Sequence, residues 1–428
     1  MQTIILRCIK CGSVYPENEV RHDCNCGGLL DVVHDLQALK GKLSTALFDE
    51  RLAERQGAAG SGVWRFRELI SSAPLEGIVS RPEGNTPLYR SHSLALWTGI
   101  EDLVCKHEGE NPSGSFKDRG MTVGVTQAVR LGARAVACAS TGNTSASLAA
   151  YSALAGLKAL IFIPEGAIAY GKLAQALAYG ATVFQVQGDF DAAMHLVQDV
   201  CRELGIYLLN SMNPFRVEGQ KSIIFEALQQ RSWQAPDWIV FPAGNLGNTS
   251  AFGKALLELK ELGWVSRMPR LAAVQAHGAN PFFQSFQGGF RDCPQIKPET
   301  LATAIRIGNP ISFPRAVRSI RATDGVVVEV NDQEILDAKA RVDRAGIGCE
   351  PASAAALAGA RLLREDGLIK ANQSVLAILT GHLLKDPENT IDYHLSRVKG
   401  IRPAFANPPQ GIEASLEAVK LALAGALS

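Results

Sequence analysis

Short apolar runs alternate with amphipathic stretches along this chain from about residue 101 onward. Each run is rich in β-branched or aromatic residues and nearly continuous in hydrophobicity, which is typical of parallel strands covered on both faces. Segments such as 144–156 and 189–205 have the apolar spacing of a helix and end at a glycine. The predicted strands are 134–140, 158–164, 181–187, 206–211, 237–243, 271–276, 326–330 and 375–380.

The strict alternation of strand and helix predicts an α/β fold built from doubly wound parallel sheets. At 428 residues the chain exceeds one ordinary core, because domains usually hold about 100–200 residues. Residues 281–315 carry several prolines, glycines and aromatics, so we expect a long functional loop or an insertion there.

Charge and cysteine usage narrow the class of protein. Lys+Arg number 43 and Asp+Glu 42, a net charge of +1, so neither nucleic acid nor an acidic membrane is an expected partner. No stretch approaches the ~18 apolar residues of a membrane span, and the first apolar run ends at Arg7 before a secretory pattern develops. Five of the nine cysteines are scattered, which favours a reducing compartment. We therefore expect a soluble, cytoplasmic protein.

The other four cysteines lie in the first 34 residues, in the patterns CIKCG and CNCGG: Cys8, Cys11, Cys24 and Cys26. Four thiolates on two tight turns could hold one zinc ion tetrahedrally, and they would leave no position for water or substrate. The metal would then be structural. Since the second pair is separated by only one residue, a metal-free or partly degenerate ribbon remains an alternative.

Ligands of open parallel sheets bind at the carboxyl ends of the strands, so the loops there are the places to look for chemistry. The segment NPSGSFKDRG (111–120) puts Lys117 at a helix start, where the amide dipoles disfavour a protonated amine. Bonding the amine to an aldehyde removes this conflict. The alternative is an exposed lysine in a Gly/Ser-rich turn.

Three further loops complete a set of contacts. Hydroxyls and amides of 140–147 could bind an anion, and Asn143 could donate to a phenolic oxygen. The glycine-rich turn 243–250 could surround a phosphate, although it matches neither a dinucleotide fingerprint nor a P-loop. Thr380 could hydrogen-bond a pyridine nitrogen. Taken alone, each loop has a structural alternative: a helix cap for 140–147 and for Thr380, and a structural turn for 243–250. Together the loops supply what pyridoxal phosphate needs.

With these motifs the chain resembles fold-type II pyridoxal-phosphate enzymes, and among them the threonine synthase family. The resemblance covers nearly the whole sequence and rests on the cysteine knuckle, GNTPL (84–88), NPSGSFKDRG, ASTGNTSAS (139–147), NPFRVEGQKS (213–222), AGNLGN (243–248), CEPASAA (349–355) and TGHLLKDP (380–387). It implies a tryptophan synthase β-like architecture with the cofactor between two α/β domains. The implied boundaries are 1–34 for the knuckle, 35–117 with 233–428 for the large domain, and 118–232 for the small one.

The resemblance also implies roles for single residues. Lys117, beside Phe116, would hold the cofactor as a Schiff base and remove the α-proton of the substrate once freed. Asn143 would bind the phenolic oxygen and Thr380 the pyridine nitrogen. The cofactor phosphate would lie on Gly244, Asn245, Leu246, Gly247 and Asn248.

The implied substrate is O-phosphohomoserine, which reacts with water to give threonine and phosphate. Thr141 would bind its carboxylate, and its phosphate would lie among Ser140, Asn210, Arg216 and Asn245, with Arg216 as the charged anchor. Glu350 is a weaker candidate, since EPASAA also reads as a helix start. The family implies a homodimer. Alternatives are cysteate synthase, other β-replacing or eliminating enzymes of the fold, and a binding protein that has lost activity.

Overall fold

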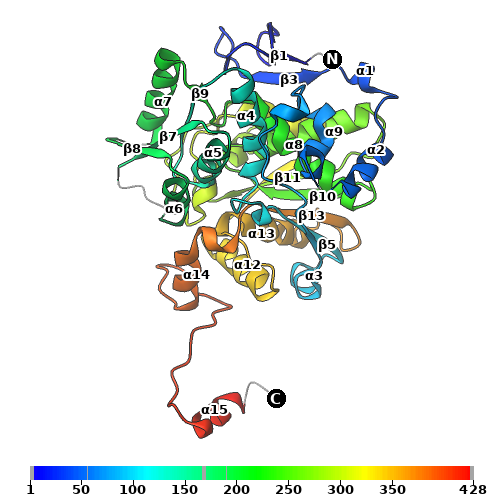
Figure 1. The fold of residues 1–428 in the computed structure, drawn as a ribbon. Helices are drawn as coiled ribbons and strands as arrows, with labels where there is room; N and C mark the ends of the chain where they lie inside the picture. Colours follow the sequence, from blue (N-terminus) through cyan, green and yellow to red (C-terminus); the bar gives the residue numbers. More distant parts are fainter. Residues whose placement is uncertain (1–3, 55, 166–169, 189, 425–428) are drawn as a thin grey trace.

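Three sheets organise the protein (Figure 1), whose computed structural model describes residues 4–424 except 55, 166–169 and 189. The large sheet has the strand order β12-β11-β10-β13-β5-β4 and the small sheet β8-β7-β6-β9; all pairs are parallel except β4 with β5. A third, antiparallel sheet, β2-β1-β3, carries the cysteines. The strands are β1 (Ile4–Cys8), β2 (Val14–Pro16), β3 (Leu30–His34), β4 (Leu88–Tyr89), β5 (Asp102–His107), β6 (Ala135–Ala139), β7 (Lys158–Pro164), β8 (Thr182–Val186), β9 (Tyr207–Leu208), β10 (Trp238–Pro242), β11 (Arg270–Ala276), β12 (Val326–Val330) and β13 (Ser374–Leu379).

The α/β class and the parallel sheets are confirmed, and every predicted strand is present with its ends shifted by a few residues at most. The prediction missed β4 and β5 of the large sheet and named no strand in the knuckle, where β1, β2 and β3 lie. The helices are α1 (Leu36–Leu39), α2 (Thr45–Glu50), α3 (His92–Thr98), α4 (Lys117–Arg130), α5 (Asn143–Leu154), α6 (Tyr170–Ala178), α7 (Phe190–Leu204), α8 (Pro214–Gln230), α9 (Gly247–Glu261), α10 (Pro281–Gln287), α11 (Phe313–Ala322), α12 (Asp332–Arg344), α13 (Pro351–Glu365), α14 (Pro387–His394) and α15 (Leu416–Leu423).

The expected long loop at 281–315 is only partly correct. Residues 288–312 are irregular apart from a short 3-10 turn at Thr303–Ile305. The two ends are helical, however, because Pro281 and Pro314 each fall in the first turn of a helix, where a missing amide hydrogen costs nothing.

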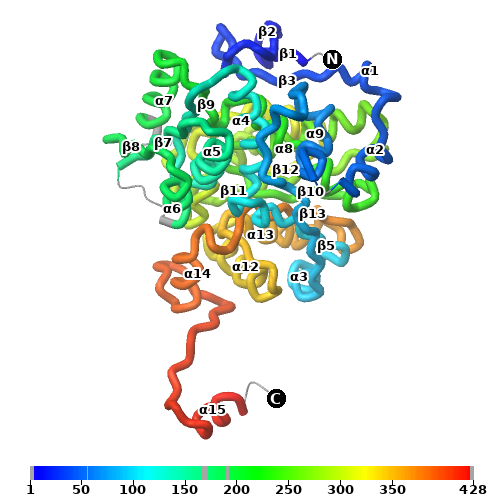
Figure 2. Tube along the Cα trace, in the orientation of Figure 1, coloured from blue at the N-terminus to red at the C-terminus, as the bar shows by residue number. Residues whose placement is uncertain are grey.

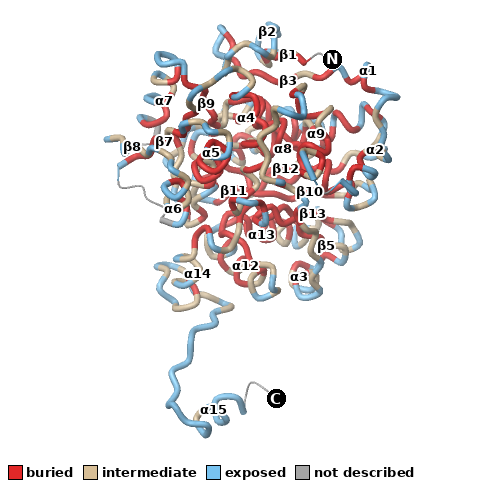
Figure 3. The backbone as a smooth tube through the Cα atoms, viewed as in Figure 1, coloured by how far each residue is buried: buried red, intermediate tan, exposed pale blue. Residues whose placement is uncertain are grey.

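Each strand of the large sheet sends alternate side chains into two separate cores. In β10, Ile239 and Phe241 pack with α8, α9 and α11, whereas Trp238 and Val240 pack with α13 and α12. Because both faces are covered, the strands read as continuous apolar runs and their carboxyl ends remain the available edge. Figure 3 shows the buried backbone concentrated in these layers.

The antiparallel sheet lies across the top of the molecule in Figure 2. The segment that contains it is bonded to a helix of the large sheet and to a strand of the small sheet. Asp31 pairs with Arg315 of α11 at 3.1 Å. On the other side, the His22 ring accepts a hydrogen bond from the Leu208 amide of β9 at 3.4 Å. The knuckle therefore contacts elements around both parallel sheets. We call the large sheet with its helices the large lobe and the small sheet with its helices the small lobe. At the opposite end, α15 buries no residue and stands apart from the other elements (Figures 1 and 3).

Strands β6–β9 all fall within 118–232, and the strands of the large sheet all fall outside that range. We therefore keep the division at 117/118 and 232/233 as a proposal: 35–117 and 233–428 form the large domain and 118–232 the small one. The bounds 1–34 for the knuckle are part of the same proposal.

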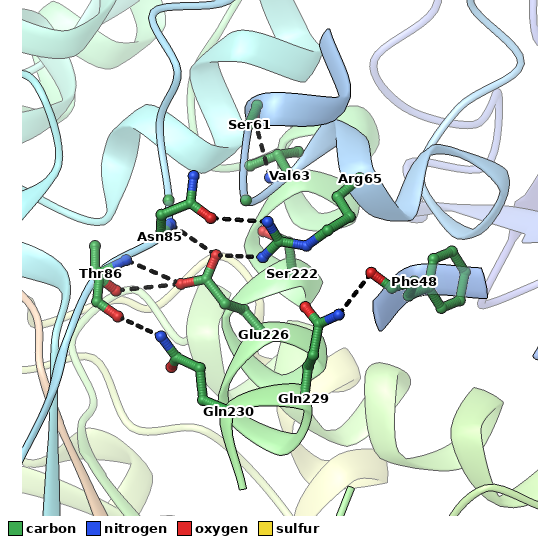
Figure 4. A network of polar contacts seen from close by, with 12 residues as sticks. Phe48, Ser61, Val63, Arg65, Asn85, Thr86, Ser222, Glu226, Gln229 and Gln230 are labelled. Carbon is green, nitrogen blue, oxygen red and sulfur yellow. Dashed lines mark hydrogen bonds and ion pairs between the residues drawn. The ribbon is translucent and has the colours of Figure 1, made fainter. Parts of the chain in front are cut away.

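A buried ionic network around Glu226 joins α4 to α8, and Figure 4 shows the part of it in which Glu226 contacts Arg65, Asn85 and Thr86. The Glu226 carboxylate of α8 accepts from Lys106 Nζ at 2.5 Å, from Arg119 Nη2 at 2.8 Å and from the Thr86 amide at 3.0 Å. Arg119 also pairs with Glu108 at 2.6 Å. Since Arg119 lies two residues after Lys117, this network holds the first turn of α4 in place.

Candidate active site

Lys117 is the first residue of α4, and the loop before it is pinned to the end of β13. The Phe116 amide donates to the Thr380 carbonyl at 3.0 Å. The Ser113 amide and hydroxyl both donate to the Asp118 carboxylate, at 2.6 and 2.5 Å. These bonds bring the predicted lysine, Phe116 and Thr380 together at one edge of the large sheet.

The Lys117 amine lies 4.2 Å from the centre of the Phe116 ring. Burial, and secondarily the Arg216 guanidinium, lower the pKa of Lys117 to about 7, against the opposing effect of Glu350. A large share of the amine is therefore neutral near pH 7 and can attack a carbonyl carbon. An exposed lysine in a turn would not have this property.

The turn after β10 forms an anion cradle. Leu246 has φ 62°, and α9 begins at the next residue, so its first amides have no partner within the helix. A Cβ at Gly244 would lie 3.0 Å from the Ile305 Cα, which explains the glycine there. The Thr249 hydroxyl is buried without a hydrogen-bond partner. Unpaired backbone amides and a hydroxyl that can donate fit a phosphate group.

The side chain of Gln220 on α8 connects this turn to α4. A Cβ on Gly247 would lie 3.1 Å from Gln220 Oε1, and one on Gly120 would lie 3.2 Å from Gln220 Nε2. The cradle and the first turn of α4 therefore contact the same side chain, which places the turn near the helix that carries Lys117.

Asn143 opens α5 and points at a carboxylate. Its Nδ2 donates to Glu350 Oε1 and Oε2 at 3.1 and 3.0 Å, while its own Oδ1 is buried without a partner. Burial raises the pKa of Glu350. The weaker candidate Glu350 thus lies beside Asn143, and the amide keeps unused bonding capacity for a ligand.

The hydroxyl of Thr380 is set up as a donor. Ser353 Oγ accepts from the amides of Thr380 and Gly381, both at 2.9 Å, and lies 3.0 Å from Thr380 Oγ1. Because both lone pairs of Ser353 Oγ are used, its hydrogen goes to Thr380 Oγ1. Thr380 keeps its own hydrogen for another acceptor, such as an unprotonated ring nitrogen. Ser353 was missed by the sequence analysis, since it reads as an ordinary small residue in an alanine-rich helix.

The predicted substrate residues lie on three neighbouring loops. Ser140 and Thr141 lie in the loop before α5, where Ser140 Oγ accepts from the Gly142 amide at 3.1 Å. Asn245 Nδ2 donates to Ser211 Oγ at 3.0 Å, which joins the cradle to the loop of Asn210. Their roles toward a substrate stay predictions.

Arg216 lies buried in the first turn of α8. Its Nη1 donates to the Leu209 carbonyl at 3.3 Å, whereas its Nε has no hydrogen-bond partner. Burial lowers the pKa of Arg216 to about 10, so the group is still protonated at neutral pH. A buried cation with an unused donor fits an anionic ligand.

The residues present fit pyridoxal phosphate on chemical grounds. A low-pKa amine, an unpaired helix start and a free hydroxyl hydrogen match the aldehyde, the phosphate and the ring nitrogen. The unpaired Oδ1 of Asn143 is an acceptor, so it matches the phenolic oxygen in its protonated form. The four cysteine sulfurs also converge: Cys8 and Cys26 lie 3.6 Å apart and Cys11 and Cys24 3.5 Å apart, and all four sulfurs lie within 4.8 Å of one another.

Comparison with known proteins assigns the family. The family model described as pyridoxal-phosphate dependent enzyme matches residues 79–381. The threonine synthase of Methanocaldococcus jannaschii is 48% identical over 91% of this chain and 94% of its own. That of Methanosarcina acetivorans is 44% identical over 98% of both chains.

Solved structures agree on the fold. The structure of threonine synthase from Escherichia coli superposes with a TM-score of 0.70 at 21% identity, covering 99% of this chain and 100% of that one. Threonine deaminase isoform 2 from Solanum lycopersicum gives 0.64 over 75% of this chain and 90% of that one, also at 21% identity. The family match, the sequence relatives and the site geometry lead to one conclusion: this chain belongs to the threonine synthase family of pyridoxal-phosphate-dependent enzymes.

Proposed function

We propose that the protein converts O-phosphohomoserine and water to threonine and inorganic phosphate. The observation that carries the proposal is Lys117, an amine of lowered pKa at the carboxyl edge of the large sheet. Bound pyridoxal phosphate supplies the electron-withdrawing group that acidifies the α-carbon of an amino acid substrate. Lys117 Nζ then accepts that proton and returns it, because the neutral amine is a base of suitable strength near pH 7.

The surrounding residues bind and orient. We propose that Gly244, Asn245, Leu246, Gly247 and Asn248 hold the cofactor phosphate with backbone amides. Asn143 binds the phenolic oxygen, and its unpaired Oδ1 can accept from that oxygen in its protonated form. Thr380 donates its free hydrogen to the ring nitrogen and, as a neutral hydroxyl, does not protonate it.

The substrate phosphate is proposed to lie against Arg216, with Ser140, Asn210 and Asn245 as polar partners and Thr141 at the carboxylate. Phosphate release and threonine formation, measured together with purified protein and O-phosphohomoserine, test the reaction. Turnover of phosphoserine with sulfite and none of O-phosphohomoserine would favour cysteate synthase.

We predict that Arg216→Gln lowers kcat/KM about 10- to 100-fold, because a charge-assisted bond to phosphate contributes about 1.5–3 kcal/mol. Most of the effect should lie in KM, since the substrate phosphate is already charged before it leaves. Arg202→Gln on the exposed face of α7 is the matched control. A KM within twofold of the wild type would exclude Arg216 as the anchor.

We also propose that the four cysteines hold a structural zinc ion. In a tetrahedral site with ~2.3 Å bonds the sulfurs lie about 3.8 Å apart, close to the 3.5 and 3.6 Å observed. The Lys10 and Cys11 amides approach Cys8 Sγ at 3.4 and 3.5 Å, as amides of a metal knuckle do. Each of these two distances joins a sulfur of the first cysteine pair to a sulfur of the second, so a metal ion would link the two turns.

Metal removal should therefore loosen the knuckle. We expect about one zinc per chain by elemental analysis, and we expect chelation to speed hydrogen exchange in residues 4–34 and lower the unfolding temperature. Cys11→Ser should lose the metal, whereas Cys293→Ser, outside the cluster, should keep it. Substoichiometric metal in protein purified without chelator would contradict the proposal.

Assembly and location belong to the same proposal. Among the described residues, no helix combines the length and apolar character that a bilayer crossing requires. We propose a cytoplasmic homodimer without nucleic-acid or membrane partners. Light scattering should give twice the chain mass of 45.8 kDa.

A further inference from the structure

Lys172 is a buried lysine that none of the roles above uses. It lies in the first turn of α6, which accompanies the small sheet and is preceded in sequence by β7. Only 1% of its surface is exposed. In Figure 1, α6 lies beside the orange segment that follows β13, and a Cβ on Gly171 would lie 3.6 Å from the Leu384 carbonyl oxygen. The helix therefore meets the large lobe at the edge where the site lies.

The Lys172 amine reaches across to three residues of the large lobe. Nζ lies 3.0 Å from both carboxylate oxygens of Asp386 and 3.2 Å from Thr303 Oγ1. It also lies 3.8 Å from Glu350 Oε2. A buried ammonium needs such partners, since an unpaired one would carry a large desolvation cost. All of them lie outside 118–232, so the pairing spans the proposed boundary between the domains.

One of these partners touches the cofactor site. Glu350 is fully buried and accepts both hydrogen bonds of the Asn143 amide. Burial raises the pKa of Glu350, and Lys172 is the strongest of the groups that oppose this rise. The positive charge of Lys172 thus favours the carboxylate form, which can accept from Asn143 with both oxygens. A protonated Glu350 could donate to Asn143 Oδ1, which would allow the Asn143 side-chain amide to flip.

A second contact of α6 supports the same arrangement. Gln175, one turn after Lys172, donates from Nε2 to the Ser113 carbonyl at 3.2 Å and accepts from Lys385. Ser113 belongs to the loop that leads to Lys117. Helix α6 is therefore attached both to the lysine loop and to the segment after β13.

We propose that Lys172 is a positioning residue that latches α6 of the small lobe onto the large lobe and, through Glu350, sets the orientation of the Asn143 amide. The inference rests on the proposed cofactor role of Asn143. A purely structural ion pair would stabilise the lobes without affecting cofactor binding; the link through Glu350 to Asn143 predicts an effect there as well.

The test compares Lys172→Met with Lys172→Arg in the full-length holoenzyme. For Lys172→Met we expect kcat to fall about tenfold or more with a smaller change in KM, and affinity for pyridoxal phosphate to fall about fivefold or more. Hydrogen exchange in 170–178 should become faster. Lys172→Arg keeps the charge and should restore kcat to within about threefold of the wild type. The exposed Lys260→Met is the control.

Lys172→Gln keeps a hydrogen-bond donor for Asp386 and covers the case in which the methionine variant does not fold. Wild-type kcat and cofactor affinity in either neutral variant would overturn the inference. So would an arginine variant as impaired as the methionine variant. If the wild type made no threonine, the proposed reaction would fail, but cofactor affinity and exchange in α6 would still decide the role of Lys172.

Discussion

Lys117→Ala should lose the covalent attachment of pyridoxal phosphate and at least about a thousandfold of the rate of threonine formation, because the same amine is the anchor and the base. The measurement is the visible absorbance of the reconstituted protein, followed by the rate with O-phosphohomoserine.

The control for this variant is Lys158→Ala, an exposed lysine of the small lobe that should behave as the wild type. The rate of cofactor attachment to the wild-type apoprotein, measured over a pH series, reports the pKa of the Lys117 amine. Since burial lowers the pKa of Lys117 to about 7, the attacking neutral form is nearly complete by pH 8. Attachment of the cofactor should speed up between pH 6 and 8 and then level off. A rate that keeps rising to pH 10, or an alanine variant with wild-type absorbance, would remove Lys117 from the role.

The sequence predicts those parts of the site that depend on local structure. A glycine turn between a buried strand and a helix can only place its amides at the carboxyl end of that strand, so the cradle at 243–250 followed from the pattern. The same rule indicated the loops of Asn143 and Thr380, whereas Lys117 was singled out by its place at a helix start and by the family resemblance. The cofactor roles of all three residues stay proposals. Local rules also gave strand β10 and its neighbours, whose apolar runs are long and uninterrupted.

Contacts between distant segments could not be predicted in this way. Lys172 lies in a helix whose pattern, YGKLAQALA, suggests a surface lysine, and its partner Asp386 is 214 residues away. Strand β5 was missed for a similar reason: Lys106 and His107 interrupt its apolar run. A lysine inside a central strand is acceptable only because Glu226, 120 residues later, lies within hydrogen-bond distance.

Glu226→Ala should cost about 3–5 kcal/mol in the free energy of unfolding, since it removes one partner of a buried ion network and leaves Lys106 and Arg119 without that carboxylate. Both cations have fully buried side chains, so water cannot replace the missing charge. Arg65 and the amides of Asn85 and Thr86 also lose their acceptor (Figure 4). The measurement is the denaturant midpoint of the apoprotein beside that of Glu203→Ala, an exposed position on α7.

A double variant separates the missing charge from the missing side-chain volume. Glu226→Gln with Lys106→Met removes one charge of each sign and nearly preserves shape, so it should recover much of the stability lost in Glu226→Gln alone. Because Arg119 follows Lys117 by two residues in α4, the single variant should also weaken cofactor binding, and the double variant should restore it in part. An unfolding midpoint of Glu226→Ala equal to that of Glu203→Ala would mean that the network does not hold α4 in place.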